Sequence, residues 1–385
     1  MIPYGRQEVT QEDVDAVVTV LKSEFLTQGF AVPLFEQVVC EYTGAKYGVA
    51  VSSATSALHL ACLALGLGKG DWLWTSPITF VASANCGIYC GAKVDFVDID
   101  QKTYNLSPQV LEDKLIRAEK KGKLPKIVIP VHFSGQSCEM EKIYQLSQQY
   151  GFKIIEDASH AIGGKYKNKP IGSSQYSDIT VFSFHPVKII TTGEGGMAVT
   201  NNQKLAEKMS LLRSHGITRD HNLMTKEPDG PWYYQQIELG FNYRMTDIQA
   251  ALGVSQMKRL DQYINKRHEI VSKYDYEFQE LDVTTPFQKR ESYSAFHLYV
   301  IMLEERLSLH HKEIFIMFRE KEVGVNLHYI PVHTHPYYRG MGFKMGDYPN
   351  SESYYQHAIS LPIYPSLSDE EQNRVIDTVK SVLSQ

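Results

Sequence analysis

The chain has 385 residues, of which 43% are hydrophobic, 22% charged and 11% aromatic, so it is long enough for one large or two ordinary domains with a sizeable core. This composition excludes a small disulfide-stapled scaffold and a chain that is disordered throughout. The 39 Lys and Arg residues against 44 Asp and Glu leave a formal charge of -5, which argues against general affinity for nucleic acid or an anionic membrane.

The five cysteines are scattered through apolar stretches without a C-x-x-C pair, which favours reduced thiols in a cytoplasmic protein. Cys86 and Cys90 would share one helix face, but their small, apolar neighbours favour core packing over a metal or redox role. The N-terminal residues 1–11 lack the pattern of a signal peptide, and no apolar segment reaches the ~20 residues needed to span a bilayer. We therefore expect no metal, no signal peptide and no membrane partner.

The predicted elements alternate between short apolar strands and amphipathic helices. In chain order they are a helix capped by Thr10, strand 47–51, polar turn 52–56, helix 57–65, strand 72–74, helix 81–89, strand 94–97, strand 126–131, helix 140–148, strand 153–155, strands 179–184 and 197–200, and helix 203–212. Buried Val- and Ile-rich strands between helices predict an α/β fold whose mostly parallel sheet is covered by helices, with ligands at the carboxyl ends of the strands.

After residue 258 the sequence changes in character. Residues 257–276 predict one long, charged helix, and the aromatic, proline-punctuated residues 293–365 predict a smaller α+β domain. We therefore expect a large α/β domain over residues 1–258 and a small C-terminal α+β domain over residues 259–385.

The most unusual stretch is the segment 182–196, where Lys188 follows an apolar strand and precedes a glycine-rich turn. A lone lysine in such surroundings is either a stem that extends to solvent or an amine whose pKa is lowered by burial. An uncharged amine is the form that makes a Schiff base with an aldehyde cofactor. The residue pattern alone leaves both interpretations open.

Three further segments could contribute to such a site. Asp157 ends a buried strand, where a carboxylate either caps a helix or faces a cationic ring nitrogen. The hydroxylated segment 52–57 lies at a strand-to-helix turn, which is a common N-cap and also a place where free N–H groups favour a phosphate. Phe80, in the segment 77–80, could lie against a planar cofactor, although taken alone it resembles a core phenylalanine.

In this order and spacing, the four elements resemble the DegT/StrS-type sugar aminotransferases of pyridoxal phosphate (PLP) fold type I, over nearly the whole chain. The segments 3–7, 26–29, 214–220 and 231–234 are most similar to the branch that aminates a UDP-linked 4-keto-6-deoxy-N-acetylhexosamine at C4 in pseudaminic acid biosynthesis. The resemblance implies a cytoplasmic homodimer with shared active sites, in which L-glutamate donates the amino group.

The resemblance also implies roles for individual residues. Lys188 matches the lysine that forms the Schiff base and then moves the proton, and Asp157 matches the partner of the pyridine nitrogen. The matches to the remaining cofactor contacts are Phe80 for the stacking aromatic, Ala54, Thr55 and Ser183 for the phosphate cradle, His160 for the ring hydroxyl, and Asn242 for a residue from the other subunit. The matches to substrate-binding positions are Ala54, Ser183, Asn242, the N-terminal arm at Tyr4, and Glu24, Phe25, Leu26, Thr27, His328, Tyr329, Ile330, Pro331 and Val332.

Two departures from the family pattern bear on the site. Ala54 and His160 stand where much of the family has glycine and glutamine, so a methyl group adjoins the phosphate and a histidine must serve the ring hydroxyl. Some members of the family are dehydratases in which histidine replaces the lysine, so Lys188 favours transamination. The alternatives are amination of a different nucleotide-linked keto sugar and a non-catalytic regulator that binds PLP or a nucleotide, but a pure binder would not need both Lys188 and Asp157.

Overall fold

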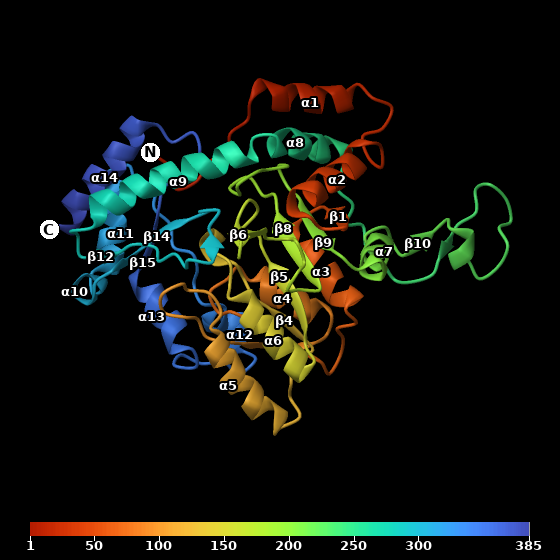
Figure 1. The fold of residues 1–385 in the computed structure, drawn as a ribbon, viewed down its shortest axis with the longest axis horizontal. Coiled ribbons are helices and arrows are strands. Elements are labelled where there is room, and N and C mark those ends of the chain that lie inside the picture. Colours follow the sequence, from red (N-terminus) through yellow and green to blue (C-terminus); the bar gives the residue numbers. More distant parts are fainter. Residues whose placement is uncertain (385) are drawn as a thin grey trace.

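The centre of the molecule is a seven-stranded sheet. The computed structural model describes residues 1–384, and the strands of this sheet lie in the order β1-β9-β8-β5-β4-β2-β3 (Figure 1). Their bounds are β1 (Tyr47–Val51), β9 (Gly196–Thr200), β8 (Ile179–Ser183), β5 (Lys153–Asp157), β4 (Ile127–Ile129), β2 (Trp72–Thr75) and β3 (Lys93–Phe96). Every strand expected for this sheet is present, with its ends displaced by a residue or two.

The sheet is mostly parallel, as expected, and β9 is the exception. β9 pairs antiparallel with β1 and β8, whereas the pairs from β8 through β5, β4 and β2 to β3 are parallel. The residues 184–195 that join β8 to β9 contain no helix. A parallel return would need a crossover connection, usually a helix, so the chain turns back directly. This turn places Lys188 just beyond the carboxyl end of β8.

Helices cover both faces of the sheet because successive strand residues point to opposite sides. In β8, Val181 packs with helices α3, α4 and α7, whereas Phe182 packs with α2 and α8. In β4, Ile129 joins the first group, whereas Val128 packs with α5 and α6. The helices are α2 (Ala31–Thr43), α3 (Ala54–Ala64), α4 (Ala82–Tyr89), α5 (Pro108–Glu119), α6 (Met140–Tyr150), α7 (Gln203–Leu212) and α8 (Asp247–Met257).

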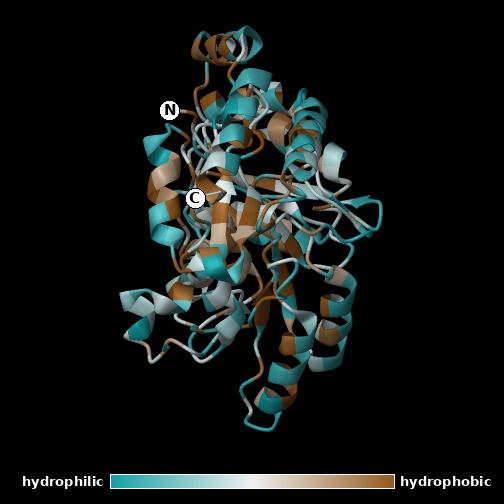
Figure 2. Cartoon of the chain, turned by 90° about the vertical axis from the view of Figure 1, so that its left-hand side faces the viewer, coloured by the Kyte–Doolittle hydropathy of each residue, from teal (hydrophilic) through white to brown (hydrophobic). Residues whose placement is uncertain are grey.

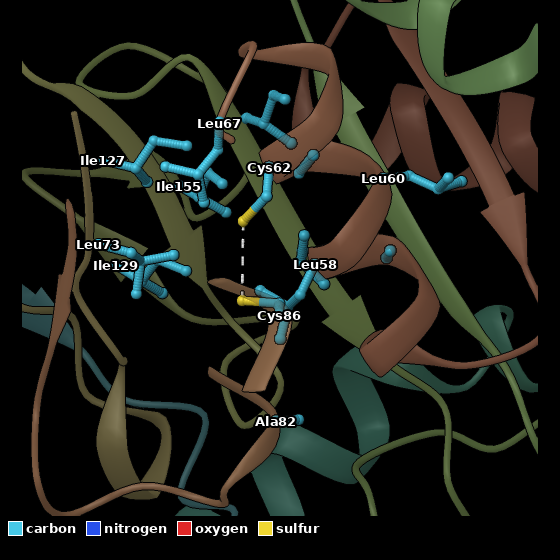
Figure 3. Close-up of a cluster of buried hydrophobic side chains, with 14 of the residues drawn as sticks. Leu58, Leu60, Cys62, Leu67, Leu73, Ala82, Cys86, Ile127, Ile129 and Ile155 are labelled. Atoms are coloured by element: carbon cyan, nitrogen blue, oxygen red, sulfur yellow. Dashed lines mark hydrogen bonds between the residues drawn. The ribbon is translucent and has the colours of Figure 1, made fainter. Parts of the chain in front are cut away.

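Cys86 packs in the core, as its neighbours predicted. Cys62 of α3 and Cys86 of α4 are fully buried, and their sulfur atoms lie 3.7 Å apart among aliphatic side chains (Figure 3). Cys90 caps the carboxyl end of α4 and is half-buried. All five cysteines are free thiols.

The long helix predicted over residues 257–276 is present, but it begins at residue 260 rather than 257, because one helix ends there and another starts. The chain forms α8 and then α9 (Leu260–Phe278), and Arg259 between them leaves helical geometry at φ -110° and ψ 3°. The guanidinium of Arg259 there pairs with the buried carboxylate of Asp13, at 2.5 Å, on α1 (Gln11–Leu21). The Asp13 carboxylate also accepts from the Thr10 N–H, which confirms the predicted cap of α1. The break therefore fastens α1 over the α8–α9 junction (Figure 1).

Helix α9 leads into a second, smaller core, consistent with the α+β pattern predicted from the C-terminal sequence. Its antiparallel sheet consists of β12 (Val283–Thr284), β14 (Tyr299–Leu303) and β15 (Ala358–Leu361), and it packs with α11 (His311–Glu320) and α14 (Asp369–Leu383). The N-terminal Ile2 is buried in this core beside Val323. The domain boundary at residue 258 stays a prediction.

The remaining elements are short. They are β6 (Lys165–Tyr166), β7 (Lys169–Pro170), β13 (Ser292–Tyr293), β10 (Ile217–Thr218), β11 (Gln235–Gln236), α10 (Glu305–Ser308), α12 (Pro336–Arg339) and α13 (Pro349–His357), with 3-10 turns at 133–135, 221–223 and 332–334. The segment around β10 and β11 projects from the body of the molecule in Figure 1. In Figure 2 the surrounding helices carry teal and brown bands, as amphipathic helices do. Within residues 1–384, none of the helices is both long and apolar enough to span a membrane.

Candidate active site

A cavity of about 690 Å³ lies where the carboxyl ends of β5 and β8 face the segment 326–329. The residues predicted for the site that line this cavity are Tyr4, Ala54, Thr55, Phe80, Asp157, His160, Ser183, Lys188, His328 and Tyr329. The fold thus gathers residues from six separate parts of the sequence. The placement follows from the sheet topology, since neighbouring parallel strands end at the same edge.

Lys188 lies in the turn after β8 and points into the cavity. Its N–H donates to the carbonyl of His185 at 2.9 Å, which fixes the turn. Burial lowers the pKa of the Lys188 amine to about 8, although the negative charge of Asp157 acts in the opposite direction. Compared with the ordinary value of 10.5, this shift increases the uncharged amine at pH 7 roughly 300-fold. The amine is therefore suited to nucleophilic attack and to proton transfer.

Asp157 is the last residue of β5, and its carboxylate is almost completely buried. Oδ1 accepts from the Ser159 N–H at 3.1 Å and from the Ser159 hydroxyl at 2.6 Å. Oδ2 accepts from the Ser83 hydroxyl at 2.6 Å. Three donors to one carboxylate fix its orientation. Such a group can hold a cationic ring nitrogen in the cavity.

His160 is held by hydrogen bonds at both ring nitrogens. The Ser134 N–H donates to Nδ1 at 3.3 Å, and Nε2 lies 3.1 Å from the Tyr329 hydroxyl. Burial, aided by the charge of Lys188, lowers the pKa of His160 well below its usual value, so the ring is neutral at pH 7. Because Nδ1 accepts a hydrogen bond, Nε2 carries the proton and donates to Tyr329. The pair therefore presents a hydroxyl whose own proton is free to bind a second acceptor.

The amino end of α3 forms the opposite wall. The helix begins at Ala54 rather than at residue 57 as predicted, because the Ser53 hydroxyl accepts from the Ser56 N–H and caps it. The first amides of a helix have no intrahelical acceptor, so those of Ala54 and Thr55 can serve an anion. A side chain on Gly196 would place its Cβ 2.4 Å from the Ala54 nitrogen. Glycine is therefore required for β9 to approach this helix end.

The C-terminal segment and the N-terminal arm close the other side. The rings of Tyr4 and His328 lie 5.2 Å apart, and the His328 Nδ1 lies 2.9 Å from the Ser360 hydroxyl. Burial lowers the pKa of His328 to about 3, so this ring is neutral as well. Phe80 is 60% exposed at the cavity and its ring lies 6.4 Å from that of Tyr329, so the core interpretation of Phe80 is wrong.

Several residues predicted for the site lie outside the cavity of their own chain. The four consecutive residues Glu24, Phe25, Leu26 and Thr27 are exposed in the connection between α1 and α2, and Asn242 is exposed near the base of the projecting segment. Ile330 is exposed, whereas Pro331 and Val332 are buried, and Val332 packs in the core beneath α3 and α4. The side chain of Val332 therefore faces the core rather than a ligand.

The sequence interpretation missed several residues of the site, three of which bear on its chemistry. Asn326 and His297 line the cavity, and Ser83 donates to Asp157. Ser83 lies in the first turn of α4, three residues after Phe80, and this closeness to the predicted segment 77–80 was the signal for it. His297 and Asn326 flank segments of the small C-terminal sheet, and no local pattern indicated that this sheet faces Lys188.

The fold and the lysine–carboxylate cavity define a PLP-dependent aminotransferase of fold type I. The sequence model of the DegT/DnrJ/EryC1/StrS aminotransferase family matches residues 7–380, and the chain belongs to this family. It is therefore a sugar aminotransferase that uses PLP, as the resemblance implied.

Two curated relatives match at the same identity. UDP-4-amino-4,6-dideoxy-N-acetyl-beta-L-altrosamine transaminase of Campylobacter jejuni is 39% identical, over 100% of this chain and 98% of its own length. Spore coat polysaccharide biosynthesis protein SpsC of Bacillus subtilis is 39% identical, over 99% of this chain and 97% of its own.

Solved structures share the whole fold. Helicobacter pylori PseC, an aminotransferase involved in pseudaminic acid biosynthesis, has a TM-score of 0.91 and 32% identity, covering 100% of this chain and 99% of its own. The PLP form of Streptococcus pneumoniae Spr1654 has a TM-score of 0.89 and 28% identity, covering 100% and 98%.

Proposed function

We propose that this chain transfers an amino group from L-glutamate to C4 of a UDP-linked 4-keto-6-deoxy-N-acetylhexosamine, in pseudaminic acid biosynthesis. The observation that carries the amination chemistry is the amine of Lys188, with its pKa lowered by burial, in one cavity with the buried carboxylate of Asp157. The substrate class is supported by the name of the Campylobacter transaminase, and the pathway by PseC, an aminotransferase involved in pseudaminic acid biosynthesis.

The residues of the cavity fit PLP. The free amides at the start of α3 and the hydroxyl of Ser183 suit a phosphate, and Gly196 lets this wall approach closely. Phe80 offers a ring face for a planar cofactor, and Asp157 suits a protonated ring nitrogen. When bound, PLP supplies an electron sink that stabilises negative charge on the carbon that loses its proton.

Lys188 moves the proton in this proposal. With a pKa of about 8, its amine accepts and returns a proton near neutral pH without a large energetic cost in either direction. His160, which is neutral, donates through Nε2 to Tyr329 and leaves the Tyr329 hydroxyl proton for an acceptor on the cofactor or substrate. The predicted contact from His160 to the ring hydroxyl is thus proposed to run through Tyr329.

We further propose that the chain acts as a homodimer in which each subunit completes the other's cavity. Asn242 and the segment 24–27 are exposed and lie outside the cavity of their own chain. The buried carboxylate of Asp247 holds the latter segment, because it accepts from the N–H groups of Gly29, Ala31 and Val32, and its own N–H donates to the Leu26 carbonyl. This rigid, exposed arrangement suits a surface that serves a neighbouring subunit.

A second candidate function is amination of a different nucleotide-linked keto sugar. It is favoured by SpsC, which is as similar to this chain as the Campylobacter transaminase but is named for spore coat polysaccharide biosynthesis. A non-catalytic regulator receives no such support, because the family is one of aminotransferases and the Campylobacter relative is named a transaminase.

The test is a substrate panel with the purified holoenzyme. UDP-linked 4-keto-6-deoxy-N-acetylhexosamine and L-glutamate should give 2-oxoglutarate and a 4-amino sugar, both measured by mass spectrometry, and the Lys188→Ala variant should give neither. UDP alone should compete with the sugar nucleotide. Amination restricted to dTDP-linked keto sugars, or a preference for L-glutamine as donor, would contradict the proposal and favour another branch of the family.

A further inference from the structure

A short chain of hydroxyl groups lies behind the Asp157 carboxylate, on the side away from Ser159. The Ser83 hydroxyl donates to Oδ2 of Asp157 at 2.6 Å, and the Thr79 hydroxyl lies 2.8 Å from that of Ser83. All three side chains are buried, with exposed fractions of 5%, 0% and 2% for Asp157, Ser83 and Thr79. Water therefore does not replace these contacts.

The donor and acceptor of each of these two hydrogen bonds follow from the number of protons that the groups carry. A serine hydroxyl carries one proton, and an ionised carboxylate can only accept, so the Ser83 proton points to Asp157. The Thr79 hydroxyl must then donate to Ser83. Each hydrogen bond polarises the next, so the donor to the carboxylate is stronger than an isolated hydroxyl.

The segment that carries these two hydroxyls also carries Phe80. The side chains of Phe80 and Ser83 point in different directions. Phe80 is exposed at the cavity, whereas Ser83 is fully buried and faces Oδ2 of Asp157. Thr79 is buried in the cavity wall and contacts Ser83. Thr79 lies just before α4 and Ser83 lies in its first turn, so the chain brings the two hydroxyls together where the helix begins. One segment thus contacts both the space for a planar cofactor and the carboxylate that would meet its ring.

We propose that Ser83, supported by Thr79, is a positioning residue that keeps the Asp157 carboxylate aimed at the cofactor's ring nitrogen. This inference rests on the role proposed for Asp157 in amination. The charged or titratable groups that interact with the Asp157 carboxylate through the cavity are Lys188 and Tyr329. Without the Ser83 hydrogen bond the carboxylate loses one of the contacts that fix its orientation, so it would hold the protonated ring nitrogen less well.

The test compares Ser83→Ala and Thr79→Val with the matched control Ser76→Ala. Ser76 is also a buried hydroxyl of this segment, but it contacts only the backbone of Ile78. Thr79→Val preserves side-chain shape and guards against simple misfolding. The readouts are kcat/KM for amination and the ¹⁵N NMR shift of the ring nitrogen in holoenzyme loaded with ¹⁵N-labelled PLP.

We expect Ser83→Ala to lower kcat/KM roughly 10- to 100-fold and to move the ¹⁵N shift toward that of an unprotonated pyridine, with a smaller change of the same sign in Thr79→Val. Ser76→Ala should change neither readout. An unchanged ¹⁵N shift in Ser83→Ala, or equal losses in Ser83→Ala and Ser76→Ala, would overturn the inference. Asp157→Asn separates the two hypotheses, because its full activity would reject the proposed role of Asp157 itself.

Discussion

Replacing Lys188 by methionine tests whether the cavity itself lowers the pKa of this amine. Methionine keeps a long, apolar side chain but removes the titrating group. We expect the Lys188→Met protein, prepared without PLP, to gain stability relative to the unmodified protein below pH 8. The gain has a simple cause, since the folded state holds a protonated amine in surroundings that disfavour its charge.

The size and sign of the effect follow from the two pKa values. The amine has a pKa of about 8 in the folded chain, against 10.5 ordinarily. Such a shift corresponds to a destabilisation of the folded state by at most about 3 kcal/mol. The actual value is smaller because the side chain is partly exposed. Below pH 8 both states are protonated and the full penalty applies. Between pH 8 and 10.5 the unfolded chain binds more protons than the folded chain, so the stability contributed by Lys188 rises with pH.

The assay is urea denaturation of both proteins at one chain concentration, from pH 7 to pH 10.5. The quantity of interest is the difference in the free energy of unfolding, because the other titrating groups are common to both proteins and cancel. We expect this difference to be largest at pH 7 and to shrink toward pH 10.5. A difference that stays constant with pH would show that the pKa of Lys188 is ordinary and would refute the argument.

Three further predictions concern the same cavity. Asp157→Asn should lower turnover by about 10² or more, with a smaller loss of PLP affinity, as measured by steady-state kinetics and PLP titration, because an amide does not hold the ring nitrogen protonated. Gly196→Ala should weaken PLP binding and lower the melting temperature, since its Cβ would lie 2.4 Å from the Ala54 nitrogen; near-normal values for both would mean that this wall yields easily. Mixing inactive Lys188→Ala with inactive Asn242→Ala should restore part of the activity through heterodimers with one intact site, and no recovery despite proven subunit exchange would place Asn242 in its own chain's site.

Much of this fold could be predicted because its strands can be recognised from local sequence patterns. Buried strands such as β8 are short, apolar and rich in β-branched residues, and their order along the chain with intervening helices indicates a parallel sheet. The antiparallel direction of β9 could not be predicted in this way, because it depends on how residues 184–195 turn back. Likewise, the break at Arg259 depends on its pairing with Asp13, which is distant in sequence.

The site was predictable to the extent that its residues lie at strand ends. Lys188 and Asp157 each follow or end a buried strand, and the sheet brings them together. Taken alone, the hydrophobic Phe80 is expected in the core. Its local sequence does not reveal that a cavity lies beside its ring. His297 and Asn326 come from the small C-terminal sheet, so finding them requires knowing how that sheet packs against the large one.

The protein contacts of the buried Asp157 carboxylate are neutral hydroxyl and amide donors rather than cations. A buried carboxylate without partners would take up a proton, and a neighbouring arginine would compete with the cofactor for the same oxygen atoms. Hydroxyl and amide donors avoid both outcomes, because they stabilise the negative charge without neutralising it. Ser83 and Ser159 each engage one oxygen from the protein side, so a cationic ring nitrogen in the cavity meets a carboxylate that is already oriented.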